Sequence, residues 1–426
     1  MLFWTSAIQT TVKLDRMRNA ESRLLAFAKT LGDRVSSSYD ISIIDTPIQR
    51  SALPLKELKC RCKAVINGKH KQNGDDDGVD DDDTKSVLNI HGVRVDSKEI
   101  DDQTNYTKTP LVMLHGYMNA GAYFYRNFAG LSKYFQTIYS LDLLGWGLSS
   151  RPSLKQLKDN SIETAEDFFV ESLETWRKYN KVDKMILLGH SMGGYISVAY
   201  SERYPERVEH LMLLSPVGVS DENDPNYQER MKRFQSSWRS RAFLGVFRRL
   251  FDMMTIGSFV RSLPEERAYG YARNYVEKRL PALMAVGEKD AVADYLFYNT
   301  MLPSSGEQCI HKFLKSNIMA KKPLKDRIPK LAVKNVSFAY GQHDWMDISG
   351  GLETQRLCNT FNHNGTNNSD VNNSSSIAPN INVFMVEEAG HLLMLENSKG
   401  TNGYLIHANG GKVPSDCIPR LVDPSK

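Results

Sequence analysis

The sequence predicts an α/β protein with a mostly parallel, doubly wound sheet that is interrupted by a helical insertion. Short apolar runs alternate with helix-like segments from residue 85 to residue 218. Residues 219–330 are mostly helix-like, and alternation resumes at Val336. Strands that alternate with helices are typical of a parallel sheet covered on both faces, and the insertion between two strands predicts a lid.

Composition narrows the class of protein. The chain has 426 residues, of which 41% are apolar and 24% charged, as in ordinary globular proteins. A formal net charge of +4 gives no overall signal for nucleic-acid binding. The five cysteines are scattered, which favours a reducing compartment. No apolar run approaches the ~20 residues of a membrane span, so we expect any membrane contact to be peripheral.

Residues 1–84 are predicted to form a helical extension that ends in an acidic loop. One stripe of a helix is formed by apolar residues at spacings of three and four: Met17, Ala20, Leu24, Phe27 and Leu31. Acidic residues in this region favour a packed or surface helix over an organelle presequence. Residues 72–84, QNGDDDGVDDDDT, are expected to be disordered. Calcium binding is the alternative, although the EF-hand spacing is missing.

The first part of the core is expected over residues 85–218 and the second part over residues 331–426. The predicted strands cover 86–95, 107–115, 135–143, 185–188, 208–214, 336–340 and 382–386, with a helix over 163–179. The stretch 362–376, NHNGTNNSDVNNSSS, is expected to be a solvated loop. The tail after Asn397 is rich in Gly and Asn and does not resemble a closing helix.

The motif Gly-His-Ser-Met-Gly, residues 189–193, lies between a predicted strand and a predicted helix. At the apex of such a turn, Ser191 would project its hydroxyl from the sheet edge as a nucleophile. Gly189 and Gly193 lack a Cβ, so the strand and the helix can approach closely. The N–H of Met192 is expected to be one donor of an oxyanion hole. The alternative is a glycine-rich turn whose serine only caps the helix.

A serine hydroxyl is a weak nucleophile at neutral pH and needs a base that is oriented by an acid. His391 follows the last predicted strand and is the expected base. Two carboxylates follow the strand over 336–340, and we prefer Asp347 as the acid, with Asp344 in reserve. The second oxyanion donor is expected to be the N–H of Tyr117. This set predicts acyl transfer without a metal or a nucleotide.

Four motifs together resemble the α/β-hydrolase superfamily, over residues 85–217 and 330–397. They are His115-Gly116-Tyr117, Trp146-Gly147-x-Ser-Ser-Arg-Pro, Gly189-x-Ser-x-Gly193 and Gly341-x-x-Asp-Trp-Met-Asp347. They are most similar to a lipid-metabolic branch. That branch includes the animal lipid-droplet lipase coactivator, its plant relatives, and fungal cardiolipin deacylases and lysophosphatidate acyltransferases.

The resemblance implies the α/β-hydrolase fold and a carboxylic ester hydrolase of phospholipase or lysophospholipase type. It also implies acylation of lysophosphatidate, with acyl-CoA as a co-substrate and no cofactor. The expected location is the cytoplasm, at the surface of lipid droplets or membranes, with mitochondrial association as a further option. The family's His-x4-Asp motif, linked to acyltransferase activity, is here His391-x4-Glu396, one methylene longer.

Residues 229–254 combine seven Arg and Lys residues with bulky apolar ones, which is typical of an interfacial helix on anionic lipid. The expected contacts with substrate or membrane are Trp238, Phe243, Phe247, Arg248 and Arg249. The alternative is a lid helix packed on the core, and no nucleic-acid module is recognised.

Three functions remain open at this point. The first is a serine acyl hydrolase or acyltransferase acting on glycerolipids. The second is a non-catalytic lipid-surface adaptor or lipase coactivator, and the third is a small-ester hydrolase. The animal coactivator lacks the elbow serine, so Ser191 favours catalysis.

Overall fold

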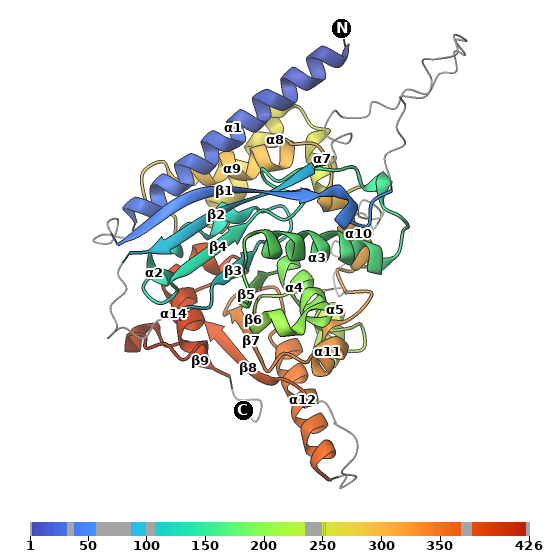
Figure 1. Cartoon of the computed structure of the whole chain (residues 1–426), viewed down its shortest axis with the longest axis vertical. Coiled ribbons are helices and arrows are strands. Elements are labelled where there is room, and N and C mark those ends of the chain that lie inside the picture. Colours follow the sequence, from blue (N-terminus) through green and yellow to red (C-terminus); the bar gives the residue numbers. More distant parts are fainter. Residues whose placement is uncertain are drawn as a thin grey trace.

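The computed structural model describes residues 2–31, 38–56, 87–98, 107–234, 249, 251, 253–367 and 377–422. Within them, nine strands form one sheet in the order β1-β2-β4-β3-β5-β6-β7-β8-β9 (Figure 1). The strands are β1 (Tyr39–Gln49), β2 (Val87–Ser97), β3 (Leu111–Leu114), β4 (Thr137–Leu141), β5 (Met185–His190), β6 (Val208–Leu214), β7 (Asn335–Gly341), β8 (Asn380–Val386) and β9 (Arg420–Leu421). Strands β3 to β8 are parallel to one another, whereas β1, β2 and β9 pair antiparallel. The predicted mostly parallel α/β sheet is confirmed.

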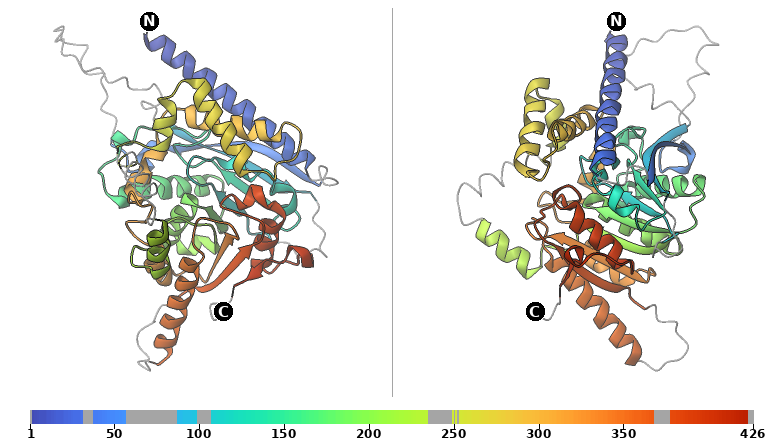
Figure 2. Two further views of the ribbon diagram at one scale, coloured as in Figure 1. Left: turned by 180° about the vertical axis from the view of Figure 1, so that it is seen from behind. Right: turned by 90° about the vertical axis from the view of Figure 1, so that its left-hand side faces the viewer.

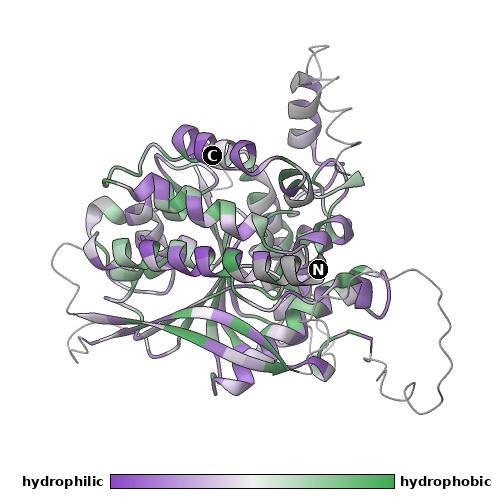
Figure 3. Ribbon diagram, turned by 90° about the horizontal axis from the view of Figure 1, so that it is seen from above, coloured by the Kyte–Doolittle hydropathy of each residue, from purple (hydrophilic) through white to green (hydrophobic). Residues whose placement is uncertain are grey.

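Helices cover both faces of this sheet. They are α1 (Leu2–Thr30), α2 (Phe128–Leu131), α3 (Ile162–Tyr179), α4 (Met192–Arg203), α5 (Pro225–Phe234), α7 (Ile256–Arg261), α8 (Glu265–Arg279), α9 (Glu288–Met301), α10 (Ile310–Phe313), α11 (Leu324–Arg327), α12 (Ser349–Asn367), α13 (Leu393–Glu396) and α14 (Ser398–Ala408). Seen from above, hydrophilic and hydrophobic residues interleave along the helices, as expected for helices with one face on a core (Figure 3).

Strand β5 lies at the centre of the sheet, and all of its residues are buried. Its side chains alternate between two apolar cores, because successive strand residues point to opposite faces. Leu187 packs in the core that contains Trp176 of α3. Leu188 packs in the other core, with Leu24 of α1 and Tyr295 of α9. Burial on both faces explains why this strand is a continuous apolar run.

The N-terminal region is part of the folded body. Met17 and Leu24, on the predicted stripe of α1, are fully buried, and Arg23 forms an ion pair with Asp294 of α9. The predicted helical extension over residues 1–84 is correct for α1 but wrong for residues 39–49, because β1 is an edge strand that pairs with β2 along its whole length. The acidic segment 72–84 lies outside the described residues.

Two predictions for the C-terminal region are also corrected. Helix α12 continues to Asn367, so the first six residues of the expected loop 362–376 are helical, and residues 368–376 lie outside the described part. The tail after Asn397 does form a helix, α14, in which Tyr404 and Leu405 are buried against the sheet. The helix begins where the Asn397 side chain accepts a hydrogen bond from the N–H of Gly400.

The insertion between β6 and β7 is mostly helical in its described residues, from α5 to α11. Both views in Figure 2 place its yellow helices beside the blue helix α1. Helix α9 contributes Val292 and Tyr295 to the same apolar core as α1. This part of the insertion is therefore built into the body of the protein. None of the described helices has both the length and the apolar character that crossing a membrane requires.

Candidate active site

Ser191 occupies a sharp turn between β5 and α4. Its backbone has φ 52° and ψ −115°, a region that residues with a Cβ rarely adopt and that costs on the order of 1–3 kcal/mol. The neighbouring glycines make the turn possible. A Cβ at Gly189 would lie 2.3 Å from the Gly193 carbonyl oxygen, and one at Gly193 would lie 2.5 Å from the Leu114 oxygen. The turn holds the Ser191 side chain at the wall of a cavity.

His391 meets Ser191 from another strand end. The Nε2 atom of His391 lies 3.2 Å from the Ser191 Oγ, and its Nδ1 atom lies 3.0 Å from the Asp344 Oδ1. The three residues follow β8, β5 and β7, whose carboxyl ends share one edge of the sheet. The structure thus brings together a hydroxyl, an imidazole and a carboxylate in the arrangement of a hydrolytic triad.

The carboxylate beside His391 belongs to Asp344, which corrects the preference for Asp347. The Asp344 side chain is almost fully buried, and its Oδ1 also accepts the N–H of Met346 at 2.9 Å. Asp347 instead accepts the N–H of Ser349 at 2.8 Å, at the start of α12. The tight turn after β7 directs the earlier carboxylate to the histidine and the later one to the helix end.

The loop that carries His391 is held by Glu396. The Oε2 atom of Glu396 accepts the N–H of Gly390 at 2.6 Å, and its Oε1 accepts the N–H of Leu392 at 3.0 Å. One carboxylate therefore binds the backbone on both sides of the histidine. The glutamate of the His-x4-Glu sequence thus stabilises the backbone conformation of the loop that carries His391.

A second histidine, His190, braces the same loop. Its Nε2–H donates to the carbonyl oxygen of His391 at 2.8 Å. Burial lowers the pKa of His190 well below its usual value, and the nearby His391 lowers it further, so His190 is neutral. His190 therefore adds no positive charge beside His391.

The expected oxyanion loop is oriented by His115. The Leu143 N–H donates to the His115 Nε2 at 3.0 Å, so the proton is on Nδ1, which donates to the Gly116 carbonyl at 2.8 Å. The Gly116 C=O and the Tyr117 N–H belong to the same trans peptide group, so they point in opposite directions. The hydrogen bond from His115 to the Gly116 carbonyl therefore turns the Tyr117 N–H away from His115. Tyr117 and Met192, the predicted donors, line the same cavity as Ser191.

Asn299 of α9 fixes this loop from the lid side, and no local sequence pattern marks this residue. Its Nδ2 donates to the carbonyl oxygens of Met118 and Asn119, each at 3.0 Å. Its Oδ1 accepts the Gly147 N–H at 2.9 Å and a guanidinium N–H of Arg151 at 3.0 Å. The side chain is buried with all four hydrogen bonds made, so α9 is coupled directly to the oxyanion loop.

A cavity of about 860 Å³ opens next to Ser191 and His391. Most of its wall is apolar, with side chains from the insertion that include Phe259, Leu296 and Phe297. Its volume lies in the roughly 300–1,000 Å³ range of small-molecule sites. Such a chamber suits a long apolar group whose reacting end lies at the serine.

Of the predicted lipid contacts, four lie outside the described residues: Trp238, Phe243, Phe247 and Arg248. Arg249 is described and exposed. Its near neighbour Phe251 lines the cavity wall, so this end of the segment reaches the site.

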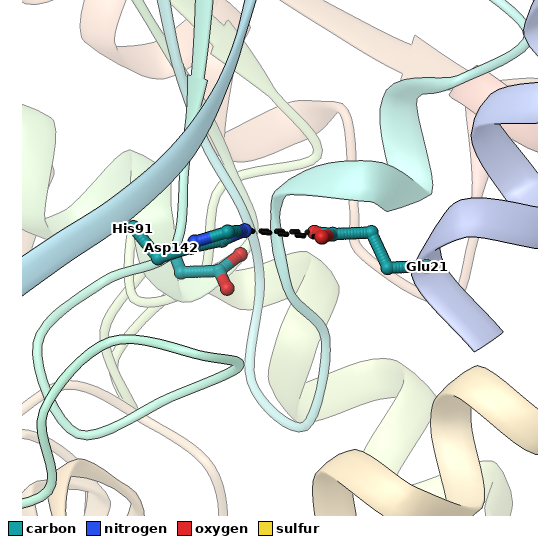
Figure 4. A group of neighbouring side chains, drawn as sticks. All are labelled: Glu21, His91 and Asp142. Carbon is teal, nitrogen blue, oxygen red and sulfur yellow. Dashed lines mark hydrogen bonds and ion pairs between the residues drawn. The ribbon is translucent and has the colours of Figure 1, made fainter. Parts of the chain in front are cut away.

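Glu21, His91 and Asp142 form a buried group whose ligand atoms lie within 4.8 Å of one another (Figure 4). Both imidazole nitrogens are already engaged, Nε2 with Glu21 at 3.1 Å and Nδ1 with Asp45 at 2.8 Å. Burial alone would lower the pKa of His91, but the hydrogen bonds to Asp45 and Glu21 raise it to about 10. A protonated imidazole offers no lone pair to a metal, so this group fits an ionic anchor for α1 and does not fit a metal site.

The geometry agrees with comparisons to known proteins. The family model described as the alpha/beta hydrolase fold matches residues 109–398, which include Ser191, Asp344 and His391. The chain belongs to the α/β-hydrolase family. The fold expected from the resemblance is thereby confirmed.

Named relatives confirm the likeness of this α/β hydrolase to the lipid-metabolic branch. It is 35% identical over 252 residues to "1-acylglycerol-3-phosphate O-acyltransferase ABHD5" of Rattus norvegicus, with 59% of this chain and 68% of the rat protein covered. It is 29% identical over 303 residues to "Probable 1-acylglycerol-3-phosphate O-acyltransferase" of Oryza sativa subsp. japonica. That match covers 70% of this chain and 66% of the rice protein.

Solved structures share the fold. The crystal structure of carboxylesterase CesB (YbfK) from Bacillus subtilis has a TM-score of 0.51 at 14% identity, and the match covers 94% of this chain and 99% of that chain. The family and the named relatives support an enzyme of the hydrolase superfamily.

Proposed function

We propose that the protein is a serine acyl hydrolase that removes acyl chains from phospholipids or lysophospholipids. The observation that carries this proposal is the Ser191–His391–Asp344 arrangement at the wall of a large apolar cavity. The names of the rat and rice relatives direct the substrate class toward glycerolipids.

The chemistry follows from the contacts. The Ser191 Oγ attacks the ester carbonyl carbon while its proton moves to the His391 Nε2, and Asp344 orients the imidazole through Nδ1. The backbone N–H groups of Tyr117 and Met192 stabilise the oxyanion. His391 then returns the proton to the leaving alcohol, and an acyl-serine ester remains.

A second half-reaction releases the acyl chain. His391 takes a proton from water, the resulting hydroxide attacks the acyl carbonyl, and the Ser191 Oγ leaves with a proton from His391. When acyl-CoA is the acyl donor, the CoA thiol leaves in the first half-reaction with the proton from His391. The hydroxyl of lysophosphatidate then replaces water in the second half-reaction and loses its proton to His391 as it attacks the acyl carbonyl. The names of the relatives favour this second activity.

A lipid product assay tests the proposal. Purified protein is incubated with a mixed lipid extract, with and without acyl-CoA, and the products are identified by mass. We expect wild-type protein to release fatty acid from glycerolipids and Ser191→Ala to release none. Ser42→Ala, at an exposed position on β1, is the matched control. Equal release by Ser191→Ala and wild type, with both folded by circular dichroism, would contradict the proposal.

Two other functions are separated by related measurements. A non-catalytic lipid-surface adaptor or coactivator would bind lipid without ester turnover. A small-ester hydrolase would act on short-chain esters and show no gain at a lipid interface, whereas the size and apolar wall of the cavity favour long acyl chains. We further propose a peripheral location on lipid droplets or membranes in the cytoplasm, with mitochondrial membranes as one option.

A further inference from the structure

Exposed apolar side chains are concentrated on the lid. Of the 17 large apolar residues in the described chain that are strongly exposed, seven fall in the 34 residues from 253 to 286. They are Met253, Ile256, Phe259, Tyr271, Tyr275, Met284 and Val286. Single exposed apolar residues are ordinary, but a group on one surface element indicates a contact surface.

The mouth of the cavity lies within this group. Ile256 and Phe259 of α7, and Tyr271 and Tyr275 of α8, are exposed and also line the cavity. A side chain with both properties stands at the rim, so the cavity opens between these two helices. A substrate that enters the site crosses this face.

The loop between α8 and α9 presents the most exposed apolar side chains of the group. Met284 is 84% and Val286 is 99% exposed, whereas Leu283 beside them is buried. Exposure of apolar side chains to water is unfavourable, so a loop that buried Met284 and Val286 would be more stable. Their exposure therefore suggests that they contact another apolar surface.

This loop is held in place by the core. A guanidinium N–H of Arg126 donates to the Ala282 carbonyl at 3.0 Å, and the Ala285 N–H donates to the Glu288 Oε2 at 3.3 Å. Arg126 forms an ion pair with the fully buried Glu288, with an N–O distance of 2.8 Å. The outward direction of Met284 and Val286 is therefore fixed by the structure.

Positive charge accompanies the apolar tip. Lys278 and Arg279 end α8, are exposed and line the cavity mouth, and no ion pair among the described residues involves them. The nearby charges Glu277 and Lys289 neutralise each other at 3.0 Å. Basic side chains beside exposed apolar ones match the surface of a membrane that contains anionic lipid.

We propose that this lid face, defined as α7, α8 and the loop 280–287, docks on an anionic phospholipid surface with Met284 and Val286 inserted. The cavity mouth then faces the lipid, and an acyl chain passes from the membrane to Ser191 without crossing water. The docking surface deepens the proposed function, since it names how the substrate reaches that site. It follows segment 229–254 in the chain, from which the sequence predicted membrane contact.

Vesicle flotation tests the proposal in full-length protein that carries Ser191→Ala, so that no lipid is consumed. The probes are vesicles of phosphatidylcholine alone and of phosphatidylcholine mixed with phosphatidylserine. We expect Met284→Ser with Val286→Ser to weaken binding at least about tenfold, from the loss of two apolar side chains. The control, Ile377→Ser with Ile418→Ser, removes two exposed apolar residues near β8 and β9, at the opposite end in Figure 1, and should bind like the parent.

Two further readouts separate docking from catalysis. With Ser191 intact, the Met284/Val286 double variant should hydrolyse a soluble short-chain ester like wild type, because neither residue lines the cavity. Lys278→Gln with Arg279→Gln should reduce the preference for phosphatidylserine, by about fivefold per charge. Unchanged vesicle binding by the Met284/Val286 variant would overturn the docking proposal. A different outcome is that the Met284/Val286 variant loses vesicle binding and the wild type hydrolyses no ester. That outcome would support docking and contradict the proposed function.

Discussion

The carboxylate of Glu396 holds both sides of His391, and its replacement by glutamine removes part of that support. The two bonds, 2.6 Å to the Gly390 N–H and 3.0 Å to the Leu392 N–H, are made to a charged acceptor. Glutamine keeps one carbonyl oxygen but presents an amide NH2 to the other N–H. At least one of the two bonds is therefore lost.

The size of the effect follows from that bond. A hydrogen bond to a charged group contributes about 1.5–3 kcal/mol, and about 1.4 kcal/mol corresponds to a tenfold change in rate. Because Glu396 is only half-buried, we take the lower part of this range. We expect Glu396→Gln to lower kcat about 10- to 40-fold with little change in KM, since His391 is misplaced while the cavity is intact.

The assay measures ester hydrolysis and acyl transfer side by side. Both reactions use His391, so a positioning role predicts that both rates fall by the same factor. Glu396→Asp keeps the charge and should recover part of the activity, and Glu387→Gln, exposed in the same loop, should behave as wild type. Loss of transfer alone, with hydrolysis intact, would refute the positioning role and assign the carboxylate directly to transfer.

Three other variants test separate parts of the structure. In an ester assay, Asp344→Asn should lower kcat by about 10³–10⁴-fold and Asp347→Asn by less than about fivefold. A larger loss in Asp347→Asn than in Asp344→Asn would contradict the assignment of Asp344 as the carboxylate that orients His391. Asn299→Ala should lower kcat about 10- to 100-fold at nearly constant KM through the oxyanion loop, and an unchanged kcat would show that the loop holds its shape without it. The pKa of His91 is raised from 6.5 to about 10, so its stabilisation is complete below pH 6.5 and lost as the pH rises through about 10. Denaturant unfolding should therefore show a stability that declines across that window in wild type and not in His91→Gln, and parallel profiles would contradict the anchor.

The central strands and the turn with Ser191 were predictable because their signals are local. Strand β6 runs from Val208 to Leu214 as predicted, and its apolar run Leu211–Leu214 reflects burial on both faces of the sheet. The glycines around Ser191 mark a close approach of two backbones that no other residue allows. The position of His391 beside Ser191 followed from the rule that ligands bind at the carboxyl ends of parallel strands.

Other features depend on contacts that a local pattern does not contain. Strand β1, YDISIIDTPIQ, mixes buried and exposed residues because it lies at the edge of the sheet, so neither a buried run nor a clean alternation marks it. Helix α14 contains two glycines, but burial of Tyr404 against the sheet outweighs their low helix propensity. Asp344 and Asp347 lie three residues apart on one turn, and only the path of the backbone decides which one faces His391.

Labelling by a fluorophosphonate probe, with the modified residue located by mass spectrometry, tests the central claim most directly. The contact between His391 and Ser191 predicts a single covalent adduct on Ser191, with labelling that is slower in Asp344→Asn and absent in Ser191→Ala. Folded wild-type protein that gains no adduct at Ser191, under conditions that label a known serine esterase, would contradict the claim that this residue is an activated nucleophile.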